Sequence, residues 1–501
     1  MAPRSPACGG IAAGLAVEGM RVWGGPTPAL LVGLGDSRVS LEVKMFKLFG
    51  VLFFCGLLTP SQEVLPGLSC AVSPGAMRNV LSGAILQNGL LQQHLQSLVL
   101  PNIMDEGGLL NAPISITGLH LVKAQFPELS VMLLPGIGVQ MTIAAKLELR
   151  GNGLLGLLPE IIDIIADMSI TANIKCTNYE SGTVQVVIED CLCIFGAIKV
   201  KLLSGLLSLS INDLVHNQLA GTLPGLLCSV INVVVNLVNI QLLGTLNAVI
   251  PVGTAGTIQY QLASLPFTSG LFLGLDLDGA VQQVGGSIIP HDSSSSALPP
   301  LMDKLLVLGL RQSFLNAAVS LIIQKQSQTF ICMPEAFSGA KQLREAVMTL
   351  VAARCSSCPR TDPLSIEIAF SGNPLFLLEV KKATINLSVM IQLFIQRLDG
   401  SVLSLLLLKA DLGLSVRFSI TGRRLLLAPS LSSIALSLES SDVGISNISS
   451  LKPHCRTLLV EKFLPLLNGL LSVGIPLPNV LGIPFINADV QISAGLLAIF
   501  V

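Results

Sequence analysis

A glycine-rich segment, GNGLLG at residues 151–156, has the spacing of a dinucleotide-binding loop. In such a loop the glycines let the backbone approach a pyrophosphate, and the loop connects a buried parallel strand to a full helix. Here the preceding segment alternates polar and apolar positions, and Pro159 follows three residues later. We therefore predict a flexible turn between antiparallel strands and no nucleotide site.

Cys355 and Cys358 have the Cys-x-x-Cys spacing of redox motifs and zinc sites. A zinc site needs a second pair, and the spacing of Cys191 and Cys193 is wrong for a usual one. A redox pair needs a thioredoxin-like βαβ setting, which this loop lacks. We predict structural cysteines or ordinary disulfides here, with no metal and no cofactor.

Other reactive side chains are scattered. Asp276 and Asp278 share a strand face, where we expect solvent-side acids at the rim of a sheet. Arg417, Arg423 and Arg424 span an expected hairpin turn, SITGRR, which is either solvated or in contact with lipid headgroups. The five histidines do not cluster, and the sequence has no nucleophile elbow or paired catalytic carboxylates. We predict no catalytic residues and a protein that is not an enzyme.

Composition narrows the function classes. The chain has 501 residues, of which 51% are hydrophobic and only 12% are charged, whereas soluble domains carry about 25% charged residues. Either it sits in a membrane or it encloses apolar surface beyond an ordinary core. The formal net charge of −1 provides no field for nucleic acid.

The segment LLCSVINVVVNLVNIQLLGTL, residues 226–246, carries no charge. It is long enough to span a bilayer. On a helical wheel, however, its polar residues form one stripe, which is poorly suited to lipid because each amide needs a hydrogen-bond partner. These are Ser229, Asn232, Asn236 and Asn239. The stripe favours a buried amphipathic helix of a soluble protein.

The N-terminal segments concern targeting. Residues 45–61 have the charged, apolar and small-residue parts of a signal peptide, behind an upstream extension, 1–44, that we expect to be disordered. An internal signal-anchor is the alternative. Sequons at Asn386 and Asn447 favour the secretory pathway. Of eleven cysteines, nine follow the signal peptide, so at least one is free or pairs between chains if the rest are oxidised.

The pattern of helices and strands is the same in both halves of the chain. The first half, 62–292, has a helical segment near 75–100, alternating strands at 138–150, 168–176 and 183–190, the uncharged helix, and two strands within 257–281. A Ser- and Pro-rich linker follows at 293–300. The second half, 301–501, has helices at 311–324, 341–353 and 458–471, strands within 364–439 and a last strand near 487–492. Long antiparallel strands with amphipathic helices predict α+β domains. A twisted sheet curled around a long aliphatic helix leaves a wedge suited to acyl chains.

Four segments resemble the BPI/LBP/PLUNC lipid-binding family, and its long PLUNC (BPI-fold family B) group above all. They are VIEDCLCIFGAIKVKLLSGLL from Val187, LPGLLCSVINVVVNLVN from Leu223, VGTAGTIQYQLASLPFTSGLFLGLDLDG from Val252 and VEKFLPLLNGLLSVGIPLPNVLGIPFINADV from Val460. The resemblance covers roughly residues 62–501. It implies a boomerang of two BPI-type barrels joined by a central sheet, with an apolar lipid pocket in each half.

The resemblance also implies one disulfide, between Cys191 and Cys228, which joins the uncharged helix to the sheet. Such a bond contributes about 3–4 kcal/mol in the entropy model. Cys193, two residues on, is expected to point to the opposite face of the strand, so that both strand cysteines cannot reach the same helix. The cysteines without an assigned partner are Cys176, Cys332, Cys355, Cys358 and Cys455.

We therefore predict a secreted protein that sequesters or transfers phospholipid-like or other acyl-chain ligands, with the endoplasmic reticulum lumen as the alternative location. Its partners are lipids, with bacterial lipids and membrane surfaces as further candidates, and the family suggests mucosal defence. Few basic residues in the first 140 mature positions argue against capture of endotoxin by charge. The expected pocket residues on the uncharged helix are Leu227, Val230, Val234 and Leu237. A membrane-anchored scaffold and a surface-active antimicrobial protein without a pocket remain alternatives.

Overall fold

The computed structural model describes residues 66–501 except 88, 107–112, 156–157, 181–182, 203–208, 292–296, 324–326, 332, 334, 355–362 and 398–399. The expected extension and signal peptide, most of the expected linker, and Cys332, Cys355 and Cys358 lie outside the described residues. The described residues all belong to one compact unit, Val64–Val501.

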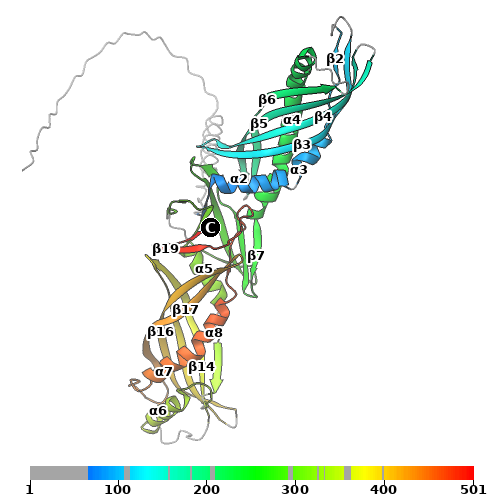
Figure 1. Ribbon diagram of the computed structural model, residues 1–501. Coiled ribbons are helices and arrows are strands. Elements are labelled where there is room, and N and C mark those ends of the chain that lie inside the picture. Colours follow the sequence, from blue (N-terminus) through cyan, green and yellow to red (C-terminus); the bar gives the residue numbers. More distant parts are fainter. Residues whose placement is uncertain are drawn as a thin grey trace, which may run out of the picture. The chain divides into compact units, whose positions relative to one another are not determined.

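The N-terminal half is built on a five-stranded antiparallel sheet of order β2-β3-β4-β5-β6 (Figure 1). Its strands are β2 (Ile103–Asp105), β3 (Ile114–Leu134), β4 (Gly138–Leu155), β5 (Leu158–Glu180) and β6 (Thr183–Leu202). From Met141 to Leu149 every second residue of β4 is buried, whereas the residues between them are half-buried. The predicted alternation is therefore confirmed, because one face of the strand packs on helices and the other meets water.

Helices cover the apolar face of this sheet. They are α2 (Pro74–Ser82), the π-helical turn η1 (Gly83–Gln87), α3 (Leu90–Gln96) and α4 (Leu209–Leu242), followed by the 3-10 turn η3 (Gly244–Leu246). The single helical segment expected near 75–100 is thus broken, and α2 begins where the Ser73 hydroxyl accepts a hydrogen bond from the Ala76 amide. The long helix α4 packs on β6.

The C-terminal half repeats the arrangement with a six-stranded antiparallel sheet of order β13-β14-β15-β16-β17-β18. Its strands are β13 (Ser327–Ile331), β14 (Leu364–Glu379), β15 (Lys382–Gln396), β16 (Val402–Thr421), β17 (Arg424–Ser441) and β18 (Ile475–Pro476). Its helices are α5 (Gln312–Ile323), α6 (Ala340–Ala352) and the continuous run α7 (Lys452–Leu458), η4 (Leu459–Phe463) and α8 (Leu464–Leu471). The helices and strands expected in this half are confirmed.

A central sheet contains strands from both halves, in the order β19-β20-β12-β1-β10-β8-β7, with β9 and β11 also paired to β10. The strands are β1 (Leu68–Val72), β7 (Ala248–Val252), β8 (Gly256–Leu262), β9 (Phe267–Thr268), β10 (Leu273–Gln283), β11 (Ile288–Ile289), β12 (Leu306–Arg311), β19 (Asp489–Ser493) and β20 (Leu496–Phe500). Strand β1 lies between β10 and β12 and so joins the halves. The predicted α+β fold with two sheet-rich halves and a central sheet is confirmed.

The structure corrects three sequence expectations. Gly151 and Gly153 lie within β4 itself, so most of the motif is the end of a strand and not a turn, whereas the expected antiparallel pairing is present, with Leu155 opposite Leu158. Asp276 is half-buried within the central sheet, where it accepts a hydrogen bond from Ser69 at 2.6 Å, and Asp278 is half-buried on the same strand. These acids are therefore not at the rim of a sheet.

The third correction concerns the arginine cluster. The expected hairpin is present between β16 and β17, and Arg417 and Arg423 are exposed. Arg424, however, is half-buried and donates a hydrogen bond of 3.1 Å to the carbonyl of Val473, next to β18. One of the three arginines is thus structural and not part of a solvated turn.

Candidate functional site

A cavity of about 290 Å³ lies between helices and sheet of the N-terminal half, and Leu481 of the C-terminal half also contributes to its wall. Its wall is almost entirely apolar, with contributions from α2, η1, the β3–β4 turn, β5, β6, the end of α4 and the segment before β10. The lining residues are Met77, Leu81, Ile85, Gly136–Val139, Ile174–Cys176, Val186, Val235, Val238, Asn239, Leu242, Leu243, Leu265–Thr268, Leu273 and Leu481. Its volume lies near the lower end of the range for small-molecule pockets, about 300–1,000 Å³.

Helix α4 forms one wall because its buried residues recur at intervals of three or four. The buried set is Ile211, Val215, Leu219, Leu223, Leu227, Val230, Ile231, Val234, Val235 and Val238. This spacing keeps one face buried over about seven turns, and the cavity opens beside the last two turns of the helix, where Val235 and Val238 line it. The polar stripe behaves as predicted at Ser229, Asn232 and Asn236, which are exposed.

The structure brings none of the four predicted pocket residues into this cavity. Leu227, Val230 and Val234 are buried against the protein, and Leu237 is half-buried. The cavity contacts of α4 instead lie at Val235, Val238, Asn239 and later residues. The apolar spacing continues past Val234, so the sequence contained a signal for the two valines, but it did not show at which turn the sheet separates from the helix.

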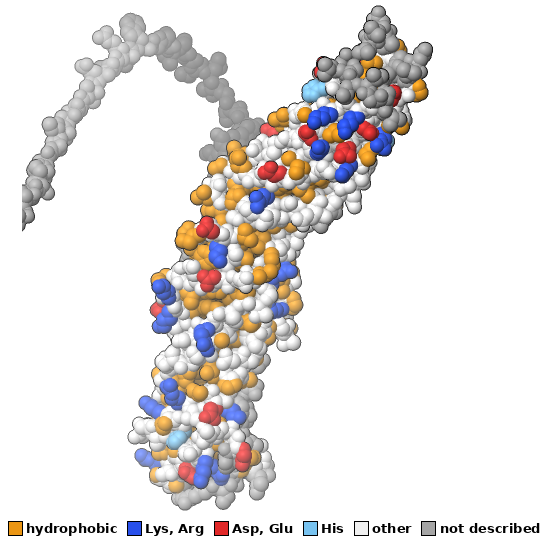
Figure 2. Space-filling view, viewed as in Figure 1, with side chains coloured by type: hydrophobic (Ala, Val, Ile, Leu, Met, Phe, Trp, Pro, Cys, Tyr) orange, Lys and Arg blue, Asp and Glu red, His pale blue; other side chains and the backbone are white. Residues whose placement is uncertain are grey.

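Apolar side chains also surround the cavity at the surface. Ile137, Leu265 and Phe267 line the cavity and are 54%, 42% and 49% exposed, and Leu271 nearby in sequence is 78% exposed. Figure 2 shows that hydrophobic side chains reach the surface over much of the visible face. Such an apolar rim is typical of sites that meet other apolar surfaces.

Charge is nearly absent from the cavity. Lys175 is its one charged lining residue, and its ammonium group forms an ion pair of 3.1 Å with Glu189. The free thiol of Cys176 also lines the cavity, and burial raises its pKa to about 11. At neutral pH the cavity therefore offers an ion-paired lysine, a protonated thiol, the neutral polar side chains of Asn239 and Thr268, and otherwise hydrocarbon.

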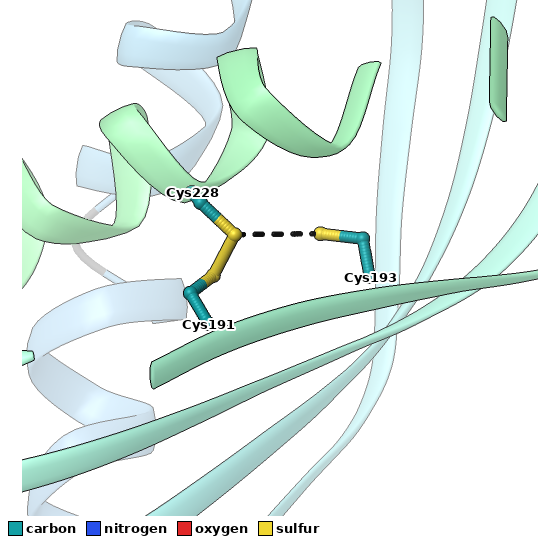
Figure 3. Close-up of side chains that lie close together, drawn as sticks. All are labelled: Cys191, Cys193 and Cys228. Carbon is teal, nitrogen blue, oxygen red and sulfur yellow. Dashed lines mark hydrogen bonds between the residues drawn. A yellow bond between two sulfur atoms is a disulfide. The ribbon is translucent and has the colours of Figure 1, made fainter. Parts of the chain in front are cut away.

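A disulfide joins Cys191 on β6 to Cys228 on α4, with the two Cα atoms 5.8 Å apart (Figure 3). This is the pair that the family resemblance implied. The bond attaches the middle of α4 to the sheet and so supports the helix that forms the cavity wall. Loss of such a crosslink releases loop-closure entropy to the unfolded chain.

The expectation for Cys193 is wrong. Its sulfur lies 3.8 Å from that of Cys228, on the same side of β6 as Cys191 (Figure 3). Side chains alternate along a strand, so residues i and i+2 share a face, and both cysteines reach α4. Cys191, Cys193 and Cys228 thus form a three-sulfur cluster containing one disulfide and one free thiol.

The two sequons are both at the surface. Asn386 is exposed in the middle of β15, and Asn447 is exposed after β17, where its side-chain oxygen accepts a hydrogen bond of 2.9 Å from the Ser449 amide. Both side chains are sterically open to modification.

Among the described residues, one helical stretch, Ile211–Leu246, is long and apolar enough to cross a membrane. A core helix of a soluble protein satisfies the same criterion. The burial of its regular apolar face and its disulfide to β6 fit the core-helix interpretation made from the sequence.

Sequence comparisons match this chain to two family models. The LBP / BPI / CETP family N-terminal domain matches residues 84–240, and the C-terminal domain of the same family matches residues 254–501. Human BPI fold-containing family B member 4 is 32% identical over 407 residues, which are 79% of this chain and 66% of that protein. Human member 6 is 27% identical over 453 residues, 88% of this chain and 96% of that protein. The mouse member 3 is 29% identical over 392 residues, 75% of this chain and 79% of that protein.

Among solved structures, the crystal structure of lipopolysaccharide binding protein has a TM-score of 0.57 at 17% identity, covering 87% of this chain and 98% of that one. At that identity the likeness concerns the fold alone. The two family models together match most of the chain. The N-terminal model matches the first sheet-rich half and the C-terminal model matches the second. The protein belongs to the LBP/BPI/CETP family of the BPI fold.

Proposed function

We propose that this protein binds lipids in the cavity of its N-terminal half and sequesters or transfers them without catalysis. The observation that carries this proposal is the apolar cavity between α4 and the sheet. An acyl chain entering it gains about 25 cal/mol per Å² of apolar surface removed from water. The ligand class is phospholipid-like or other acyl-chain lipid, and bacterial lipids belong to the same class.

The exposed apolar rim supports transfer as well as storage. Ile137, Leu265 and Phe267 belong both to the cavity wall and to the surface, so a lipid tail can leave a bilayer along a continuous apolar path. A rim of this kind contacts a membrane surface without inserting a helix. Headgroups stay near the mouth, in water.

We also propose that the chain passes through the secretory pathway, with residues 45–61 removed as a signal peptide and glycans at Asn386 and Asn447. The mature protein is secreted, with the endoplasmic reticulum lumen as the alternative, and a mucosal defence role follows the family suggestion. The mature chain divides into 62–292 and 301–501. Intact-mass measurement before and after deglycosylation tests both sites and the new N-terminus.

Native mass spectrometry of the secreted chain, with extraction of bound lipid, tests the main proposal. Wild type is expected to carry lipid in stoichiometric amount. Val238→Trp fills the cavity and is expected to lose it, whereas Ile240→Trp places the same ring on the same helix at a side chain that is 71% exposed and keeps it.

Leu242→Trp, at a half-buried position of the cavity wall, replaces Val238→Trp if that variant does not fold. Wild type without bound lipid, after exposure to vesicles, overturns the proposal. Equal lipid content in the cavity-filled and control variants overturns the assignment of the cavity.

A further inference from the structure

Asn239 differs from the rest of the polar stripe on α4. Ser229, Asn232 and Asn236 are exposed, but Asn239 is half-buried and lines the cavity. Its Oδ1 is buried and has no hydrogen-bond partner among the described residues. Buried polar atoms without partners are rare in folded proteins, and water or a bound ion is one of the explanations for them.

The other polar side chains of the cavity wall already have partners. The Thr268 hydroxyl donates to the Leu134 carbonyl at 2.5 Å, and Lys175 pairs with Glu189. Beside the weakly hydrogen-bonding thiol of Cys176, the carboxamide of Asn239 is therefore the polar side-chain group of the wall with an unpartnered buried oxygen. It is neutral, and its unpartnered Oδ1 accepts a hydrogen bond from a hydroxyl or an amide N–H.

We propose that the cavity selects uncharged amphiphiles whose hydroxyl or amide group hydrogen-bonds to the Asn239 carboxamide. This inference rests on the proposed lipid-binding function and specifies its ligand class. Long-chain alcohols, monoacylglycerols and ceramide-like lipids have the required group beside an aliphatic tail. An anionic headgroup gains less here, because the one cation of the wall is already paired.

A matched ligand pair tests the selection. 1-Tetradecanol and its methyl ether have the same tail, but only the alcohol donates a hydrogen bond. Wild type is expected to bind the alcohol about two- to tenfold more tightly, the ratio that one neutral hydrogen bond contributes. Asn239→Leu removes this preference, and Asn236→Leu, one turn earlier on the exposed side, retains it.

Competition between the two ligands, followed by native mass spectrometry, gives the ratio directly. Equal binding of alcohol and ether by wild type, or an unchanged preference in Asn239→Leu, overturns the inference while leaving lipid binding intact. Failure of wild type to bind either ligand overturns the proposed function itself. The wild-type ratio decides the question even if Asn239→Leu does not fold.

The three-sulfur cluster supports a second, independent inference. The Cys193 thiol lies 3.8 Å from one sulfur of the Cys191–Cys228 disulfide (Figure 3). We propose that the disulfide that joins β6 to α4 exists in two isomers, Cys191–Cys228 and Cys193–Cys228, which interconvert by internal thiol–disulfide exchange.

The exchange balances without an external oxidant or reductant. The Cys193 thiolate attacks the Cys228 sulfur, the bond between Cys191 and Cys228 breaks, and Cys191 leaves as a thiolate that takes up the proton lost by Cys193. Burial raises the pKa of Cys193 to about 11, so the exchange is slow at neutral pH. The attachment point of the disulfide moves two residues along β6, about 6.6 Å of strand.

Alkylation in acid followed by peptide mapping without reduction tests this. Cys191 and Cys193 lie in one tryptic peptide, and fragment ions between them show which one carries the label. Wild type is expected to be labelled mainly at Cys193 with a minor fraction at Cys191. Cys191→Ser is expected to form the Cys193–Cys228 bond, and Cys193→Ser keeps Cys191–Cys228.

Two results overturn the second inference. One is wild-type label confined to Cys193 after prolonged incubation at pH 8.5. The other is a folded Cys191→Ser variant in which Cys193 and Cys228 are both free. The wild-type label distribution remains decisive if Cys191→Ser does not fold.

Discussion

The two halves of this protein use one arrangement of strands and helices but fill it differently. In the N-terminal half, aliphatic side chains of α4 and the sheet leave a cavity of about 290 Å³. In the C-terminal half, phenylalanines bridge the elements: Phe370 of β14 contacts Phe463 of η4 with ring centroids 5.3 Å apart, and Phe376 contacts Phe418 at 6.2 Å. The Phe370–Phe463 pair thus packs between helix and sheet, whereas Phe376 and Phe418 pack strand β14 against β16.

The helices are also held differently. Cys228 ties α4 to β6 through a disulfide, whereas Cys455 in α7 is a free, fully buried thiol, and burial raises its pKa to about 12. A wall with an open cavity behind it has fewer packing contacts to hold it in place. We infer that the covalent bond compensates in the N-terminal half for packing that the C-terminal half obtains from its core.

The largest expected effect tests the packing difference. Phe463→Ala should lower the free energy of unfolding by about 3–5 kcal/mol, because it opens a void in a filled core. Val238→Ala should cost about 1–2 kcal/mol, since it removes two methyl groups beside an existing cavity. Urea unfolding measures both, and equal losses contradict the comparison.

The second largest expected effect concerns the disulfide between α4 and β6. Cys228→Ser removes both possible disulfides to β6 and should cost about 3–4 kcal/mol in the entropy model for a 37-residue separation. Cys455→Ala in the other half should cost about 1 kcal/mol, because only one buried sulfur is lost. Thermal unfolding of the two variants gives the contrast. A Cys228→Ser variant as stable as wild type shows that packing alone holds α4.

A third prediction concerns the alkylation rate of the Cys176 thiol in the cavity wall. Lipid at ten times its dissociation constant should slow alkylation of Cys176 about tenfold, because the ligand covers a thiol in the cavity wall. Since the pKa of Cys176 is raised to about 11, its thiolate fraction and labelling rate rise about tenfold per pH unit up to that value, so the assay is run near pH 9.

Cys455 serves as the internal control for this assay in the C-terminal half. Its labelling rate should be slow and unaffected by the ligand. Equal protection of Cys176 and Cys455 points to a general tightening of the protein and not to occupation of the N-terminal cavity.

Strands with one solvent-exposed face could be predicted from the sequence, whereas strands buried on both faces could not. Strand β4 alternates visibly because water meets half of its side chains. Strands β1 and β20 are buried at every position, so alternation does not mark them. Strand β1 pairs with β10 and β12, far away in sequence, whereas β20 forms a short hairpin with β19 and also pairs with the distant β12. Strand β3 was missed because three register shifts against β4 interrupt its period.

The site was only partly predictable for a related reason. The uncharged helix could be recognised, but the turn at which it separates from the sheet depends on β5, β6 and the β3–β4 turn together. No sequence pattern within α4 shows that Val235 lines the cavity and that Val234 does not. The position of Cys193, by contrast, follows from strand alternation alone, and the expectation failed through a misapplied period.

The smallest expected effect tests whether α4 is a core helix or a membrane span. The question concerns α4 and not α5 of the other half, because α5 is too short to cross a membrane. Ile240 is 71% exposed on α4. In a soluble protein Ile240→Lys should change the free energy of unfolding by no more than about 0.5 kcal/mol, because the ammonium group stays in water. In a bilayer the same lysine costs about 2.5–3.5 kcal/mol near the helix centre.

We expect Ile240→Lys to be secreted, lipid-loaded and released by carbonate as wild type is, whereas Val238→Lys, two residues earlier at the cavity wall, loses stability by several kcal/mol. If carbonate leaves wild type in the membrane pellet and Ile240→Lys alone shifts it to the supernatant, α4 is a membrane span and the cavity beside it is not the binding site.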